Sequence, residues 1–294
     1  MLPGLFDGLL EYGLGAGVEA FSTRRNAALP YPVIQGHQVH DCKVAVIDSP
    51  GLTREELEGY DAFVTRLPDV AVGVRTADCI PVLLYDPVQR AVAAVHAGWK
   101  GTVMHISQKT INVMVQRFGC NPSAMRAVIG PGIGPDSFQV GEEVAEHFKQ
   151  ADFPMDEVWS FRGPGDGSPM SGGHHIDLFK ANRWLLEDAG VPAAHIQITG
   201  IDTFTDESFF SARREGVRCG RIINAIKLVP PVKGRARGPI PLLNGPAAAC
   251  PSARRPASGH LPPGRALHRT GGPIRGNTPF SDPRTGTSAR PVRA

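Results

Sequence analysis

Short runs of apolar and β-branched residues, separated by turn residues, recur through the first half of the chain and predict strands. The clearest runs are KVAVID at 43–48, VAVGV at 70–74, VLLYD at 82–86 and AVAAVH at 91–96. Only the four residues Pro87–Arg90 separate the last two runs. That connector has the length of a turn, so we expect these two strands to pair as a hairpin.

Helical spacing of apolar residues appears further along the chain and alternates with more strands. One helix is predicted from the Gly101-Thr102 cap to Phe118-Gly119, a short one near 141–150, and a third over 177–189. Further strands are expected at 127–130, 195–199 and 221–229. Because strands and helices alternate irregularly and without an internal repeat, the sequence predicts a single layered α/β domain with a mixed sheet over residues 1–230.

The last 64 residues, 231–294, differ in composition from the rest. Pro (12) and Gly (9) make up a third of them, and no helical or strand alternation is visible. This segment holds 11 of the 31 Lys and Arg residues beside one acid, Asp282, so it carries +10 while residues 1–230 carry −7. Such a composition buries too little apolar surface to offset the entropy lost on ordering. We therefore expect a disordered C-terminal tail.

The tail does not favour a nucleic-acid partner, because its basic residues are scattered among prolines, with only Arg254 and Arg255 adjacent, and no aromatic residue except Phe280 lies between them. An extension beyond a natural stop is the simpler interpretation. Export and membrane insertion are not indicated either. No stretch approaches 18 consecutive apolar residues, and the N-terminal MLPGLFDGLLEYG has acids where a signal peptide has a positive region. We expect a cytoplasmic protein without a membrane partner.

Five cysteines, odd in number and widely spaced, favour reduced thiols or metal ligands over a disulfide framework. One of them, Cys79, lies between two expected strands, while His40 precedes the first strand and His96 stands where a strand gives way to a helix. Sites in α/β folds form at such strand ends. One thiolate and two imidazoles leave a fourth tetrahedral position open, as a catalytic zinc requires. The spacings of 39 and 17 residues match no compact zinc motif, so a buried thiol with two hydrogen-bonded histidines stays the alternative.

Six sequence motifs occur along the chain, and they are more informative than the spacing of His40, Cys79 and His96. They are FSTR (21–24), HQVH (37–40), TADCIPVLLYD (76–86), VHAGWKGT (95–102), IGPGIGPDSFQVG (129–141) and FFSARREGVRCGR (209–221). Together they closely resemble the laccase-domain, or multicopper polyphenol oxidase-like, family, now regarded as purine nucleoside phosphorylases. The resemblance spans roughly residues 18–228, although the family's Gly-Gly-Val-Ser segment after Arg24 is missing. It implies a single αββα-type domain with one zinc held by His40, Cys79 and His96.

The resemblance also implies an activity: phosphorolysis of adenosine, inosine and S-methyl-5′-thioadenosine, with adenosine deamination as a second activity at the same zinc. A metal-activated water suits attack on C6 of adenine. We assign Asp78, next to Cys79, to proton transfer or to orientation of the ligand. Arg24 and Arg213 are expected to position phosphate for attack on the ribose C1′. The family's S-x-R-R segment lies near the pocket, which adds Ser211 to the expected site.

The alternative function is a copper-dependent polyphenol oxidase (laccase) that oxidises phenols. A His₂Cys site also suits copper, and Cu²⁺ outcompetes Zn²⁺ for such ligands. However, the chain lacks the paired H-x-H motifs and the H-C-H tripeptide that true multicopper oxidases need. Purine nucleosides and phosphate are therefore the first choice of substrates, and phenols the second. A non-enzymatic metal-dependent binding module is disfavoured by the open coordination position, and no residue indicates editing of cell-wall precursors.

Two further patterns are weaker. The glycines of 130–134 superficially resemble a dinucleotide fingerprint, but Pro131 and Pro135 remove amide donors that a helix N-terminus would need. The pair His174-His175 is expected to be a solvated loop pair and not a metal site. The sequence does not indicate an oligomeric state.

Overall fold

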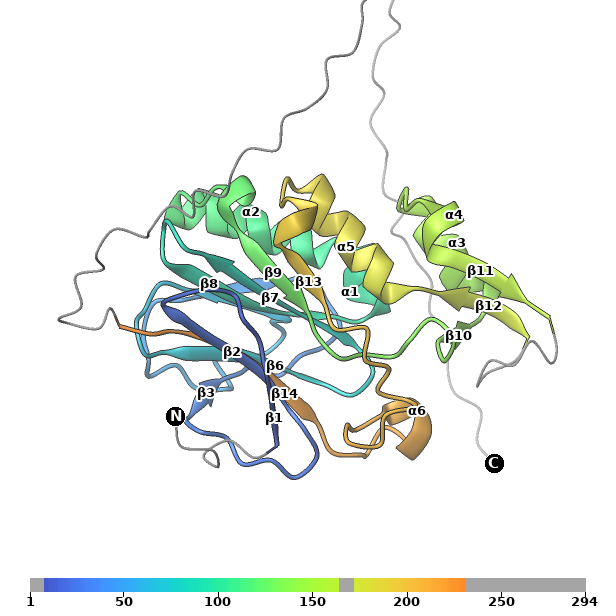
Figure 1. Cartoon of the computed structure of the whole chain (residues 1–294), viewed down its shortest axis with the longest axis horizontal. Helices are drawn as coiled ribbons and strands as arrows, with labels where there is room; N and C mark the ends of the chain where they lie inside the picture. The colour runs from blue at the N-terminus through green and yellow to red at the C-terminus, as the bar shows by residue number, and fades with distance from the viewer. Residues whose placement is uncertain (1–7, 164–171, 231–294) are drawn as a thin grey trace, which may run out of the picture. The chain divides into compact units, whose positions relative to one another are not determined.

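The structure, a computed structural model, describes residues 8–163 and 172–230. Two large β-sheets face one another, and helices cover the outer face of one of them (Figure 1). The layered α/β class with mixed sheets that the sequence predicts is confirmed. The expected disordered tail and the expected boundary at 230 concern residues outside the described part of the chain.

The two large sheets are built from segments distant in sequence. The six-stranded sheet has the order β13-β9-β7-β8-β5-β4, and the five-stranded sheet has the order β1-β2-β14-β6-β3. The strands of the first are β4 (Val44–Ile47), β5 (Ala62–Thr65), β7 (Ile80–Asp86), β8 (Ala91–Ala97), β9 (Arg126–Ile129) and β13 (Ile196–Ile198). The strands of the second are β1 (Leu9–Glu11), β2 (Val18–Thr23), β3 (Val33–Ile34), β6 (Ala71–Thr76) and β14 (Ile222–Leu228).

Helices and a small third sheet complete the described part of the chain. The helices are α1 (Trp99–Val103), α2 (Ile106–Phe118), α3 (Glu142–Gln150), α4 (Met155–Val158), α5 (Leu178–Asp188) and α6 (Ala212–Glu215). The third sheet has the order β10-β12-β11, from β10 (Gln139–Val140), β11 (Trp159–Arg162) and β12 (Gly173–Ile176). Within the described ranges, none of the helices combines the length and the apolar character that a membrane crossing needs.

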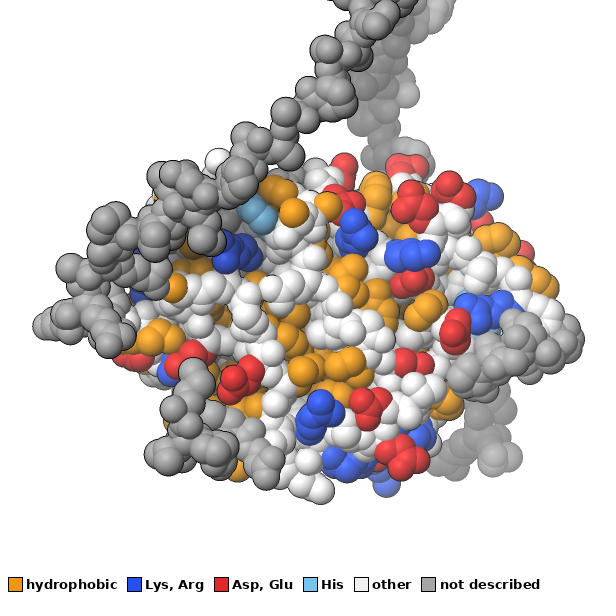
Figure 2. All heavy atoms as spheres, in the orientation of Figure 1, with side chains coloured by type: hydrophobic (Ala, Val, Ile, Leu, Met, Phe, Trp, Pro, Cys, Tyr) orange, Lys and Arg blue, Asp and Glu red, His pale blue; other side chains and the backbone are white. Residues whose placement is uncertain are grey.

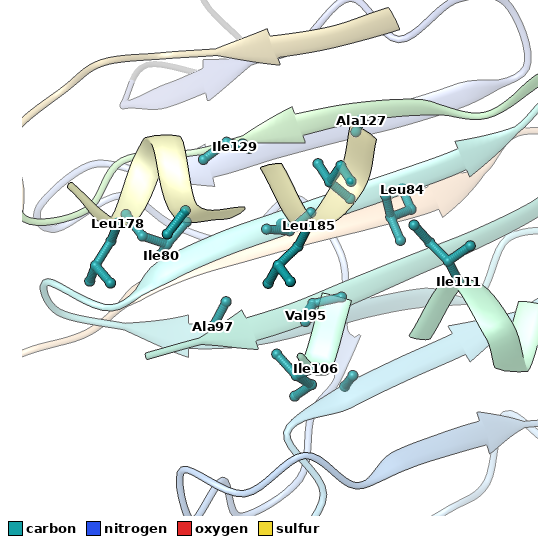
Figure 3. Close-up of a cluster of buried hydrophobic side chains, with 14 of the residues drawn as sticks. Ile80, Leu84, Val95, Ala97, Ile106, Ile111, Ala127, Ile129, Leu178 and Leu185 are labelled. Carbon is teal, nitrogen blue, oxygen red and sulfur yellow. The ribbon is translucent and has the colours of Figure 1, made fainter. Parts of the chain in front are cut away.

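The central strands β7 and β8 form the predicted antiparallel hairpin, and every residue in both strands is buried. Alternation of side chains sends one set toward the helices and the other toward the five-stranded sheet. In β7, Ile80 and Leu84 join the helix-side cluster, which Figure 3 shows packed against Leu178 and Leu185 of α5. Leu83 lies in the second cluster, between the sheets. Because both faces of these strands are covered, their sequences are continuous apolar runs and do not alternate between apolar and polar residues.

Two sequence predictions about these elements are wrong. The helix expected up to Phe118 is two helices, α1 and α2, because His105 adopts a left-handed conformation (φ 59°) between them and packs its ring edge-on against Phe153. The pair His174-His175 lies on strand β12 and not in a loop. Strand alternation buries His175, which contacts the carbonyl oxygen of Pro135, and leaves His174 against Trp159.

Candidate metal centre

The structure brings His40, Cys79 and His96 together, as the sequence predicts. One ligand-type atom from each lies within 4.8 Å of the others. The Sγ atom of Cys79 is 3.8 Å from Nε2 of His40, and the rings of the two histidines stack edge-on with centroids 4.8 Å apart. In residues 8–163 and 172–230 no other group of three or more His, Cys, Asp or Glu side chains comes together in this way.

Strand register explains why these three residues meet. Ile80 pairs with Ala97 across β7 and β8, so continuing the register by one step places Cys79 opposite Gly98 and beside His96. An added Cβ at Gly98 would lie 3.0 Å from Sγ of Cys79 and 3.2 Å from Cδ2 of His40. Any larger residue at position 98 would therefore push Cys79 or His40 away by a few tenths of an ångström.

His40 is fixed by a carboxylate that the sequence analysis missed. Asp61 is fully buried, and its side chain accepts hydrogen bonds from the backbone N–H groups of Val39, His40 and Asp41 at 3.0–3.1 Å. The same carboxylate lies 2.6 Å from Nδ1 of His96. A carboxylate that accepts the Nδ1 proton of a ligating histidine fixes its tautomer and directs Nε2 at the metal. Asp61 thus orients the imidazole of His96 and fixes the backbone that carries His40.

The charged forms of Cys79, His96 and Asp61 stabilise one another. Burial alone would raise the pKa of the Cys79 thiol, but His96 and His40 outweigh burial and lower it to about 6. Burial would likewise lower the pKa of His96, but the Cys79 thiolate and Asp61 outweigh it and raise that pKa. Burial opposes ionisation of Asp61 as well, yet its hydrogen bonds hold the pKa below the ordinary value. The residues therefore favour a thiolate near neutral pH, the form of cysteine that binds metals.

The donor set fits a metal ion. One thiolate and two imidazoles match catalytic zinc, which keeps a fourth position for water or substrate, and the same ligands suit copper. Gly98 itself adds no side chain to the space beside Cys79 and His40. His40, Cys79 and His96 are the residues that would hold the ion.

The three residues line a cavity of about 800 Å³. A cavity of this size accommodates a small organic substrate. Its lining contains five arginines and one acid: Arg54, Arg75, Arg213, Arg218, Arg221 and Asp78. Of these arginines, Arg213 belongs to the expected site, and the sequence leaves Arg221, together with Arg213 and Arg214, open between a solvated face and a fork for phosphate. The imbalance of charge makes the cavity suited to an anion.

Two of the four other expected site residues lie at this cavity. Asp78 lines it, but its carboxylate accepts the hydroxyl of Thr203 at 2.7 Å and the backbone N–H of Arg213 at 2.6 Å. Asp78 therefore anchors helix α6 to the turn that carries Cys79. The Arg213 guanidinium also lines the cavity, where it donates to the carbonyl of Gln139 at 3.1 Å and covers the ring of Phe138.

The remaining two lie outside the cavity lining. Arg24 donates to the Ser208 hydroxyl at 2.6 Å and stacks on the ring of Phe209. Ser211 is fully buried and caps helix α6, where its Oγ accepts the backbone N–H of Arg214 at 3.1 Å. Closeness to a motif in sequence does not say where a side chain points, and here both side chains support the loop that leads into α6.

Comparison with known proteins agrees with this geometry. The family model described as "Multi-copper polyphenol oxidoreductase laccase" matches residues 18–229. A purine nucleoside phosphorylase of Bacteroides thetaiotaomicron is 38% identical over 228 residues, covering 72% of this chain and 82% of that protein. A protein named adenosine deaminase RL5, from an unknown prokaryotic organism, is 41% identical over 201 residues, covering 66% of this chain and 74% of that protein.

The fold is shared with solved structures as well. The crystal structure of the hypothetical protein YfiH of Bacillus licheniformis superimposes with a TM-score of 0.66 at 25% identity, and covers 75% of this chain and 96% of that one. The match in sequence extends over more than half of the chain. This protein belongs to the multi-copper polyphenol oxidoreductase laccase family.

Proposed function

We propose that the protein is a metal-dependent purine nucleoside phosphorylase, acting on adenosine, inosine and S-methyl-5′-thioadenosine, that also deaminates adenosine. The observation that carries the proposal is the placement of His40, Cys79 and His96 in the wall of a cavity whose other charges are almost all arginines. A metal centre and an anion-binding wall are the two features that these reactions need together. Relatives named for each of the two activities support the proposal.

A bound metal would supply a Lewis acid and activate water in this cavity. The chain's own residues prepare the site for it. Asp61 holds the imidazole of His96 and the backbone at His40 in place before substrate arrives. The arginines provide the positive potential that attracts phosphate and favours its approach to the sugar. Phe138 adds an apolar ring to the lining, against which a base can pack.

Product analysis tests the proposal. Zinc-loaded full-length protein is incubated with adenosine, with and without inorganic phosphate, and adenine and inosine are separated by chromatography. We expect adenine only with phosphate, because phosphate is the nucleophile in phosphorolysis. Deamination uses water, so inosine should form under both conditions, and with phosphate part of it should appear as hypoxanthine. His96→Ala removes both products. His147→Ala, an exposed histidine on α3, is the control and retains both. Wild-type protein that forms neither product would refute the proposal.

Copper-dependent phenol oxidation is the second candidate function, supported by the family description and by the His₂Cys donor set. Zinc has no accessible redox change, so phenol oxidation requires the copper-loaded protein. The same samples are therefore assayed with a phenolic substrate after loading with copper. Phenol turnover with several coppers per chain, without nucleoside turnover in either metal form, would make the oxidase the primary function.

A further inference from the structure

Three arginines in the cavity wall come from different segments of the chain. Arg75 is in strand β6, Arg221 directly precedes strand β14, and Arg54 lies in the loop before β5. In the register of the two strands, Ile223 pairs with Arg75. Arg221 is two residues before Ile223, so its side chain is on the same face of the sheet and is the diagonal neighbour of Arg75. Sheet pairing therefore brings two guanidinium groups together at one edge of the cavity.

The positive charges of Arg54, Arg75 and Arg221 are not paired with an acidic side chain among the described residues. Burial, and after it the charges of Arg54 and Arg221, lower the pKa of Arg75. In the described part of the chain, the ion pairs formed by arginines involve Arg25, Arg162, Arg183 and Arg214, and none involves the three cavity arginines. On the face of the molecule seen in Figure 2, basic and acidic side chains are interspersed. The cavity wall differs from that face because its like charges gather without a partner.

The cluster is also tied directly to the candidate metal centre. The side-chain amide of Gln38 accepts the backbone N–H of Arg75 at 2.8 Å and donates to its carbonyl at 2.9 Å. Two residues after Gln38 comes His40, and four residues after Arg75 comes Cys79. These two hydrogen bonds hold the backbone at Arg75 in a fixed position but leave its guanidinium unused. An anion bound there would lie in the same cavity as the metal ligands.

We propose that Arg54, Arg75 and Arg221 form a subsite for a phosphate group. The guanidinium of Arg221 already donates to carbonyls of the preceding turn, among them Val217 at 2.8 Å, which fixes its plane. Arg54 and Arg75 have no such side-chain hydrogen bond among the described residues and are available to the oxygens of the anion. Guanidinium groups bind phosphate through paired, charge-assisted hydrogen bonds. This inference rests on the proposed function for the use of the phosphate, and it replaces Arg24 as an expected phosphate ligand.

The phosphate group has two possible sources, free phosphate or the 5′-phosphate of a nucleotide. Titration calorimetry distinguishes them: inorganic phosphate and AMP are titrated separately into the full-length, metal-loaded protein at constant ionic strength. We expect binding of at least one of the two ligands, weakened about tenfold or more in Arg75→Gln and in Arg54→Gln. Loss of phosphate binding in the variants assigns the subsite to the free anion. Loss confined to AMP assigns it to the nucleotide, and both outcomes support a phosphate-group subsite.

Two controls keep this test decisive. Arg183→Gln on α5 removes an arginine paired with Glu187 outside the cavity, and it should bind both ligands as the wild type does. Arg54 is exposed and makes no internal side-chain hydrogen bond among the described residues, so Arg54→Gln should fold, as a melting curve will show. Wild-type protein that binds neither ligand, or unchanged affinities in both cavity variants, would overturn the subsite.

The failure of the subsite and the failure of the proposed function give different results. In one case, phosphate binds the wild type and not the variants, and no sample forms adenine. This result supports the subsite and refutes the phosphorylase. Adenine formation with the same phosphate KM in wild type, Arg75→Gln and Arg54→Gln supports the phosphorylase and refutes the subsite.

Discussion

The Nδ1 atom of His96 lies 2.6 Å from Oδ1 of Asp61, and both side chains are buried. The register of the sheet places them opposite each other: Ala62 pairs with Val95 and Phe63 with Ala94, so the next step pairs Asp61 with His96. Their backbones are joined as well, through the N–H of His96 and the carbonyl of Asp61 at 2.8 Å. The orientation of His96 is therefore a property of the strand pairing between β5 and β8.

Replacement of Asp61 tests this positioning role. Asp61→Asn cannot accept the same four hydrogen bonds, so we expect zinc affinity to fall by about 10–100-fold, the usual effect of removing such a partner of a ligating histidine. Competition with a chromophoric chelator measures the affinity. The control is Asp188→Asn, an exposed carboxylate on α5 that is far from the ligands in sequence and accepts a hydrogen bond from Gln108. Equal zinc affinity in Asp61→Asn and wild type would refute the role.

Removal of the thiolate tests the ligand set itself. Cys79→Ala should release the metal, because this thiolate is the only ligand charge that offsets the dication. Cys219 also lines the cavity but does not belong to the ligand group, which makes Cys219→Ala the matched control. Elemental analysis of both purified variants gives the metal content per chain. Stoichiometric metal in Cys79→Ala would show that the ligands are wrong.

The reactivity of Cys79 in metal-free protein should follow its lowered pKa. Alkylation requires the thiolate, whose fraction grows as pH rises through the pKa, so half-maximal labelling with iodoacetamide is expected near pH 6. Burial raises the pKa of Cys120 to about 12 and also raises that of Cys219, so both should label only at higher pH. Peptide mass analysis resolves the cysteines. A midpoint for Cys79 at the same pH as Cys219, or above it, would contradict the electrostatic account.

A single methyl group should disturb the candidate centre. In Gly98→Ala the new Cβ would lie 3.0 Å from Sγ of Cys79, which forces a shift that costs about 1–3 kcal/mol. We expect metal affinity to fall about tenfold or more, with a smaller loss of stability. Gly13→Ala is the control, because an added Cβ there meets no atom within 4 Å. Equal zinc affinity in Gly98→Ala and Gly13→Ala would show that metal binding does not depend on the close approach of Cys79 and His40 to Gly98.

The boundary expected from composition gives a prediction for the shortened chain. We propose that residues 1–230 fold and act without 231–294, because that segment has no periodic apolar residues and is a third Pro and Gly. The truncated and full-length proteins should have equal melting temperatures and equal nucleoside turnover. Loss of cooperative melting in the truncated protein would show that a folded element had been removed.

The three candidate ligands could be predicted from sequence, because each lies in a distinct motif beside an apolar run. Asp61 could not, because it precedes the short run AFVT without any neighbouring His or Cys, and only the β5–β8 register brings it to His96. The roles given to Arg24 and Ser211 relied on nearness to a motif, whereas side-chain direction depends on the turn before α6. The cavity arginines lie on separate segments, so their clustering required the pairing of β6 with β14.

The turn that carries Cys79 is also the crossover between the two large sheets, since β6 belongs to one and β7 to the other. An ion held by Cys79, His40 and His96 would therefore resist any separation of the sheets at this end of the sandwich. Binding and local opening are then linked, because the ion binds only the closed form. Amide hydrogens at this end of β6 and β14 should therefore exchange more slowly in the metal-loaded protein, so that their exchange rates would report metal occupancy.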